Sequence, residues 1–303
     1  MALAGRALSA GERAPRGAGG HPGRGALGAP DGAHAGRRPG AGGAHRADER
    51  DERVPRRREP PAVTRKPRAL LLTCEHASAA VPDALRERFL AHHGDERILE
   101  THRAYDIGAR SAARFLAKAL GAPLLETEVS RLVVDANRHR SHPRVLGPAF
   151  SAAEPELREA LLTAHHDPHR ARVREAVGKG PVLHLAVHSM TSQLEGLVRG
   201  MDMALLYDPA RPTERRLADD WKHGMQQRVR GIRLRRNAPY RGVSDGLPTS
   251  IRKELPDARY AGFELELNQR AFANGRWPRE WLDELAATID RMRSAPARRL
   301  RAR

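Results

Sequence analysis

Ionisable side chains follow two apolar runs of this sequence at the point where each run ends. Glu75 and His76 follow the strand-like run Ala69–Thr73 after Cys74, and His188 follows HLAV. A charge beside a buried segment is costly unless it is paired or bound to a metal. Two histidines and one carboxylate form the protein ligand set of a catalytic zinc site that keeps one position open for water. These positions therefore predict a metal site at the ends of two strands.

Further polar residues stand on or after two other apolar segments. Glu264 and Glu266 are two residues apart in GFELELN, so in a strand they share one face. Asn137 and Arg138 follow the apolar run Leu132–Val134. Bound zinc brings the pKa of a water molecule toward about 7, and a nearby carboxylate can then act as general base. The pattern is typical of hydrolytic chemistry.

Two pairs of candidates carry alternatives that the sequence leaves open. Adjacent strand residues point to opposite faces, so Glu75 and His76 reach one metal only if the chain turns there. Otherwise one of them, more readily Glu75, lies outside the ligand set. His102 and Asp106 are four residues apart in a helical pattern and would share a helix face. Such a pair either supports a metal ligand from behind or forms a surface ion pair.

Apolar runs of strand length alternate with segments of helical periodicity. The expected strands are 69–73, 124–125, 132–134, 182–187, 203–207 and 262–268, and the expected helices are 82–90, 101–120, 154–177, 213–229 and 277–292. This alternation predicts an α/β fold with a mostly parallel mixed sheet and helices on both faces. Ligands bind such sheets beyond the carboxyl ends of the strands, where the ionisable residues stand.

The same segments carry a resemblance to a known family. TCEHASAAVP, HRAYDIGA, SRLVVDANR, HLAVHSM, NAPYRGVSDG and GFELELNQ, in this order and at these approximate distances, resemble the N-formylglutamate amidohydrolase family. The resemblance covers Arg68 to Arg270. That family is similar in fold and site plan to zinc carboxypeptidases and to deacylases of acyl amino acids. The resemblance implies a metal-dependent hydrolase that cleaves the amide of an N-acyl, N-formylglutamate-like amino acid.

The resemblance also implies roles for individual residues. Glu75, His76 and His188 would bind one Zn²⁺ per chain. Asn137 and Arg138 would hold the substrate carboxylate, which a guanidinium can bind through two parallel hydrogen bonds. One departure stands out: zinc carboxypeptidases place their first two ligands as His-x-x-Glu, whereas Glu75 and His76 are adjacent.

The remaining implied roles concern the reacting groups. Arg131 would lie near the oxyanion of the tetrahedral intermediate. Glu264 would be the general base, with Glu266 as its rival on the same face. Tyr240 and Arg241 sit in the Pro- and Gly-rich loop NAPYRGVSDG, and loops of this kind often carry binding groups.

Two other features receive structural interpretations. Cys74 is the single cysteine, so no intrachain disulfide forms, and we expect a small core residue. The histidine-rich run His165–His169 resembles metal-binding sequence, but it falls in a helical stretch broken by Pro168. We expect a surface kink there.

The net charge of +17 raises a different function class, a nucleic-acid-binding protein with an inert hydrolase-like domain. Residues 1–66, rich in Gly, Ala, Pro and Arg, have no aromatic residue and no apolar period, which predicts a disordered basic tail. Any nucleic-acid contact is expected through that tail, and the catalytic domain is expected over residues 67–303. No apolar run of 18 residues occurs, so we expect a cytoplasmic protein. The oligomeric state is left open.

Overall fold

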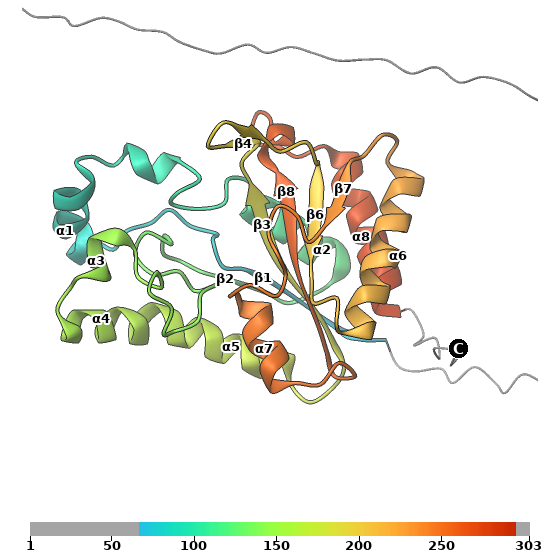
Figure 1. The fold of residues 1–303 in the computed structure, drawn as a ribbon, viewed down its shortest axis with the longest axis horizontal. Helices are drawn as coiled ribbons and strands as arrows, with labels where there is room; N and C mark the ends of the chain where they lie inside the picture. Colours follow the sequence, from blue (N-terminus) through green and yellow to red (C-terminus); the bar gives the residue numbers. More distant parts are fainter. Residues whose placement is uncertain (1–66, 295–303) are drawn as a thin grey trace, which may run out of the picture. The chain divides into compact units, whose positions relative to one another are not determined.

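The fold is organised around one six-stranded sheet (Figure 1). The computed structural model describes residues 67–294, so the expected tail, 1–66, lies outside the described residues. The strands are β1 (Ala69–Cys74), β2 (Leu124–Glu126), β3 (Val182–Met190), β6 (Met203–Leu206), β7 (Leu234–Arg236) and β8 (Tyr260–Asn268). Their order is β2-β1-β3-β8-β6-β7, and every pairing is parallel except that of β6 with β8. The expected mostly parallel mixed α/β sheet is confirmed.

The central strands β3 and β8 pair in register over their full length, from Val182 opposite Tyr260 to Met190 opposite Asn268. Both strands are buried on both faces, as expected for the middle of a covered parallel sheet. Because side chains alternate, His188 and Glu266, which are directly paired, point to the same face. This register places the functional candidates of two distant segments side by side.

Helices cover both faces of the sheet. One face packs against α2 (Ala109–Leu120), α6 (Pro212–Arg228) and α8 (Arg279–Ser294), with Trp221 and Phe263 in the largest core cluster. Part of the other face packs against α5 (Asp167–Val177) and α7 (Leu247–Glu254). These helices cover only part of the second face. The rest of that face carries polar residues, among them His188 and Glu266.

A smaller helical lobe lies beside the sheet, at the left of Figure 1. It contains α1 (Asp83–His93), η1 (Arg97–Glu100), α3 (Pro148–Ser151) and α4 (Pro155–Leu161), packed around Phe89 and Phe150. The expected strand 132–134 is wrong: this segment forms turns with one isolated bridge, Val134 to Leu146. Its apolar side chains are buried in the core of the lobe, and its backbone does not join the sheet.

The expected helix 101–120 is wrong for its first turns. Residues 101–108 form turns, and α2 begins at Ala109, after Gly108 with φ +82°. An added Cβ at Gly108 would lie 2.8 Å from the Phe272 ring, so the chain passes closely there. His102 and Asp106 consequently do not share a helix face, and the Asp106 side chain is free to turn inward.

The expected helix 154–177 is interrupted by a π-helical turn, η2 (Leu162–His166), between α4 and α5. Pro168 stands near the start of α5, where its missing N–H and its ring are tolerated. His166 and His169 are 2% and 5% exposed, so the expectation of a surface kink is wrong. Both histidines point into the protein, where His166 contacts the Arg138 carbonyl and His169 contacts Glu75.

The remaining elements are a small hairpin, β4 (Gln193–Leu194) with β5 (Leu197–Val198), and the short helix η3 (Gln269–Ala271). Within residues 67–294, no helix combines the length and the apolar character that a membrane span requires.

The loop that carries Asp135 to Arg144 is closed by a tight backbone contact at Gly147. A Cβ built there would lie 1.8 Å from the Leu132 carbonyl oxygen, which forces the backbone to move. We expect Gly147→Ala to lower the free energy of unfolding by about 3 kcal/mol. Gly180→Ala, where a Cβ meets no atom within 4 Å, is the matched control and should change it by less than about 0.5 kcal/mol. Urea unfolding measures both; equal values would contradict the close approach.

Candidate metal centre and active site

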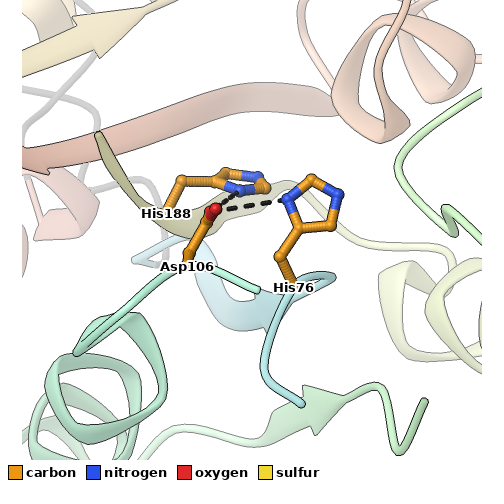
Figure 2. A group of neighbouring side chains, drawn as sticks. All are labelled: His76, Asp106 and His188. Carbon is orange, nitrogen blue, oxygen red and sulfur yellow. Dashed lines mark hydrogen bonds and ion pairs between the residues drawn. The ribbon is translucent and has the colours of Figure 1, made fainter. Parts of the chain in front are cut away.

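Three buried side chains from distant segments meet at one point: His76, Asp106 and His188 (Figure 2). Asp106 Oδ2 lies 2.8 Å from His188 Nδ1 and 3.4 Å from His76 Nδ1, and the ring centroids are 5.0 Å apart. One ligand atom from each residue lies within 4.8 Å of the others. Two imidazole nitrogens and a carboxylate oxygen are the donors that zinc prefers, so this group could bind a metal.

The sheet explains why these residues meet. β1 and β3 are parallel neighbours, with Thr73 opposite Ala186, so both chains emerge at the same edge. β1 ends at Cys74 and the chain turns at Glu75 and His76, which separates these adjacent side chains. The Asp106 backbone N–H donates to the His76 carbonyl at 3.0 Å, which fixes the turn before α2 against this edge.

Each histidine is held from behind by a second carboxylate. His76 Nε2 lies 2.8 Å from Asp135 Oδ1, and His188 Nε2 lies 3.2 Å from Glu75 Oε2. In both rings Nδ1 is therefore the nitrogen that faces Asp106. Metal-binding histidines commonly present one nitrogen to the metal and the other to a carboxylate, which fixes ring orientation and tautomer. The buried Nδ1 of His76 has no hydrogen-bond partner among the described residues, as a nitrogen directed at a ligand would, and the same is true of His188 Nε2 and of both Glu75 carboxylate oxygens.

Glu75 lies on the far side of His188 from Asp106. Its side chain is fully buried, with Oε1 3.7 Å from His169 Nε2. Burial alone would raise its pKa, but His169 and His188 outweigh that and hold the pKa well below the usual value. The structure thus groups His76 and His188 with Asp106, and it places Glu75, which the sequence put among the ligands, behind one of them. From the sequence, Asp106 is expected either to support a metal ligand from behind or to form a surface ion pair with His102, and its place in HRAYDIGA is the signal that links it to the site.

The two histidines differ in charge. Burial, together with the positive charge of Arg131, lowers the pKa of His76 to about 4, so this imidazole is neutral at neutral pH. Burial also disfavours the charged form of His188, but the Glu75 carboxylate, with Glu266 and Glu264, raises its pKa to about 9. A metal that binds both imidazoles would displace a proton from His188, whereas His76 carries no extra proton to displace.

The two arginines predicted to stabilise the oxyanion and to bind the substrate carboxylate, Arg131 and Arg138, lie beside these histidines and acids. Arg131 pairs directly with Asp106, and burial lowers its pKa from the usual value. Arg138 lies 3.6 Å from Asp135 and 3.5 Å from the Asp245 carbonyl. Both guanidiniums are therefore held by acids that also contact the histidines.

The two glutamates of β8 stand on one wall of the site. Glu264 Oε1 accepts a hydrogen bond from Asn137 Nδ2 at 3.0 Å, and the Leu247 N–H donates to Asn137 Oδ1 at 2.7 Å. Asn137 is thus tied to the candidate base. Glu266 is 8% exposed, and burial, with the charge of Glu264 adding to it, raises its pKa.

A cavity of about 590 Å³ opens in front of these groups. Every sequence-predicted site residue except Glu75 lines it, namely His76, His102, Asp106, Arg131, Asn137, Arg138, His188, Tyr240, Arg241, Glu264 and Glu266. His102 reaches the cavity from the turn before α2, and no contact joins it to Asp106 among the described residues.

The family model for N-formylglutamate amidohydrolase matches residues 68–273, a stretch that includes every residue of the site. The chain belongs to the N-formylglutamate amidohydrolase family. The resemblance seen in the sequence is thereby confirmed.

Solved structures share the fold of this chain. A gene product of Agrobacterium tumefaciens is 27% identical, with a TM-score of 0.61 over 74% of this chain and 88% of that one. An N-formylglutamate amidohydrolase from Ralstonia eutropha JMP134 shares the fold, with 16% identity and a TM-score of 0.52 over 77% of this chain and 94% of that one. Among curated proteins, none matches the chain.

The histidine-rich run has a defined place in this family member. His166 Nε2 lies 3.0 Å from the Arg138 carbonyl oxygen, and Arg170 donates to the Ala136 carbonyl at 3.4 Å. His169 stands against Glu75. The start of α5 therefore supports both the loop that carries Arg138 and the carboxylate behind His188.

We expect Glu75→Gln to weaken metal binding about 10- to 100-fold without abolishing it, because the amide cannot supply the charge that orients His188. A competition titration with a chromogenic chelator measures this. Exposed Glu87→Gln is the control and should leave the affinity unchanged. Asp106→Ala should remove binding altogether. If Glu75→Gln abolishes binding and Asp106→Ala does not, Glu75 is the ligand.

The pKa of His188 makes metal binding depend on pH. Below pH 9 that imidazole carries a proton that the metal must displace, so affinity should rise from neutral pH to about 9 and then level off. At about pH 7.5 we expect close to one proton released per metal ion bound. Calorimetry in buffers with different ionisation enthalpies counts the protons. Release of none, or of two, would contradict the assigned charges.

Proposed function

We propose that this chain is a metal-dependent hydrolase that cleaves the amide of an N-acyl amino acid of the N-formylglutamate type. The observation that carries the proposal is the buried group His76–Asp106–His188, which opens on a cavity walled by carboxylates and guanidiniums in a member of this family.

The metal proposed is zinc, one per chain, held by His76, His188 and Asp106. Asp106 replaces Glu75 in the ligand set inferred from the sequence, because its carboxylate lies between the two Nδ1 atoms. When bound, the metal would polarise the acyl carbonyl and lower the pKa of water toward about 7.

Glu264 is the proposed general base. It is held by Asn137 and remains partly exposed to the cavity, whereas Glu266 is buried. A water oxygen adds to the acyl carbon as Glu264 accepts the proton. The carbon–nitrogen bond then breaks, and Glu264 returns the proton to the leaving amine nitrogen. A formyl substrate gives formate and the free amino acid.

The cations position the substrate and its charge. Arg138 is proposed to hold the α-carboxylate, and its backbone is steadied by His166. Arg131 adds positive charge beside the reacting carbonyl, although its pairing with Asp106 limits its reach. Tyr240 and Arg241 stand on the cavity wall as further binding groups. Holding the acyl carbon beside the metal supplies much of the rate acceleration in reactions of this kind.

The alternative of nucleic-acid binding rests on the charge of residues 1–66, which lie outside the described residues. No described feature favours it. The cytoplasmic location likewise stays a prediction.

The test is a panel of N-formyl, N-acetyl and N-succinyl derivatives of Glu and Asp, incubated with the zinc-loaded full chain. We expect release of the amino acid by the wild type. Glu264→Gln should keep the metal and lower kcat by at least about 100-fold, because the proton acceptor is gone. Glu266→Gln is the matched control. If Glu266→Gln causes the larger loss, the roles are exchanged; if the wild type hydrolyses no member, the proposed function is wrong.

A further inference from the structure

Among the cavity-wall arginines that are at least partly buried, one differs from the others. Arg131 and Arg138 each have an acidic partner, Asp106 and Asp135 respectively. Arg199 is 9% exposed, and no ion pair joins it to an acid within residues 67–294. A buried guanidinium without a counter-charge is costly, and the cost falls when an anion binds beside it. This group therefore points to an anionic ligand.

The Arg199 side chain is fixed by neutral groups. Nη2 donates to the Tyr240 hydroxyl at 2.6 Å, and Nη1 lies 3.5 Å from the Thr191 carbonyl. The guanidinium carbon lies 5.1 Å from the centre of the Tyr240 ring. The stacking and the hydrogen bonds orient the guanidinium while leaving its charge unneutralised.

The backbone of Arg199 is fixed as well. Its N–H donates to the Ser192 carbonyl at 2.8 Å, across the base of the β4–β5 hairpin. Its carbonyl accepts from Asn268 Nδ2 at 3.0 Å, and Asn268 is fully buried at the end of β8. The backbone of Arg199 is thus anchored to the end of strand β8, as well as to the base of the β4–β5 hairpin.

We infer that Arg199, steadied by Tyr240, forms a subsite for a second carboxylate of the substrate, separate from the α-carboxylate assigned to Arg138. This inference rests on the proposed function. The cavity volume of about 590 Å³ falls within the usual range for small-molecule sites, about 300–1,000 Å³, and so accommodates a substrate with two anionic ends. The second carboxylate has two possible sources, the amino-acid side chain and a dicarboxylic acyl group.

The experiment compares acid and amide pairs with the zinc-loaded full chain. N-formylglutamate against N-formylglutamine tests the side chain. N-succinylglutamine against its succinamoyl counterpart tests the acyl group. We expect the wild type to prefer the acid by roughly 30-fold or more in kcat/KM in one pair, which identifies the source. Arg199→Gln should reduce that preference to less than about threefold while changing kcat/KM for the neutral amide little.

Arg144→Gln is the matched control, because it removes the same charge from an exposed position on the cavity wall. It should leave the preference intact. The inference is overturned if the wild type shows no preference in either pair, if the preference survives Arg199→Gln, or if Arg144→Gln removes it equally, since a general positive field would then explain it. A preference is a ratio within one preparation, so partial misfolding does not alter it. Should Arg199→Gln fail to fold, Arg199→Lys should lower the preference at least about fivefold, because the fork geometry is lost.

If the wild type hydrolyses no member of either pair, the proposed function fails and the subsite is tested by binding alone. Glutarate should then bind the zinc-loaded wild type more tightly than glutaramate, and Arg199→Gln should remove the difference. Equal binding of the two by the wild type would overturn the subsite independently of the reaction.

Discussion

The structure of the site depends on one carboxylate, that of Asp106, which lies between two buried imidazoles. Its charge is balanced by Arg131, and each imidazole is in turn held by a further acid, Asp135 or Glu75. In a buried site every ionised group needs such a partner, because an unpaired charge in a medium of low dielectric is strongly disfavoured. The network therefore fixes which nitrogen of each ring is available and leaves the metal-binding atoms directed at one point.

The sheet edge positions the histidines and the two glutamates, and a loop packed on the helical lobe supplies further partners. β1, β3 and β8 bring His76, His188 and the two glutamates to one edge because parallel strands end together. Asp135, Asn137 and Arg138 come from an irregular loop whose apolar residues are buried in the lobe. The site thus takes some of its residues from rigid strands and others from a loop that is not paired in the sheet.

The sequence predicts β1, β2, β3, β6 and β8 because each contains a short apolar run that polar residues follow, as His188 follows Val187. It misses β7, Leu234–Arg236, because two of its three residues are arginines. It misassigns 132–134, since an apolar run of three residues does not reveal whether it pairs in a sheet or packs in a helical lobe. Helical periodicity likewise extends through 101–108, but these residues form turns, and α2 begins only after the close contact at Gly108. Residue type alone could not separate Glu75 from Asp106, because that choice depends on the turn after β1 and on His169 being buried.

The three residues that meet at the candidate metal centre are separated by 30 and by 82 positions along the chain. No short peptide of this protein can therefore assemble the donor set, and an unfolded chain has little affinity for the ion. A ligand that binds the native state alone shifts the whole folding equilibrium in its favour. If the proposed metal binds, its loading would follow completion of the sheet, and the bound ion would stabilise the native state, so that thermal stability would rise with the concentration of the metal.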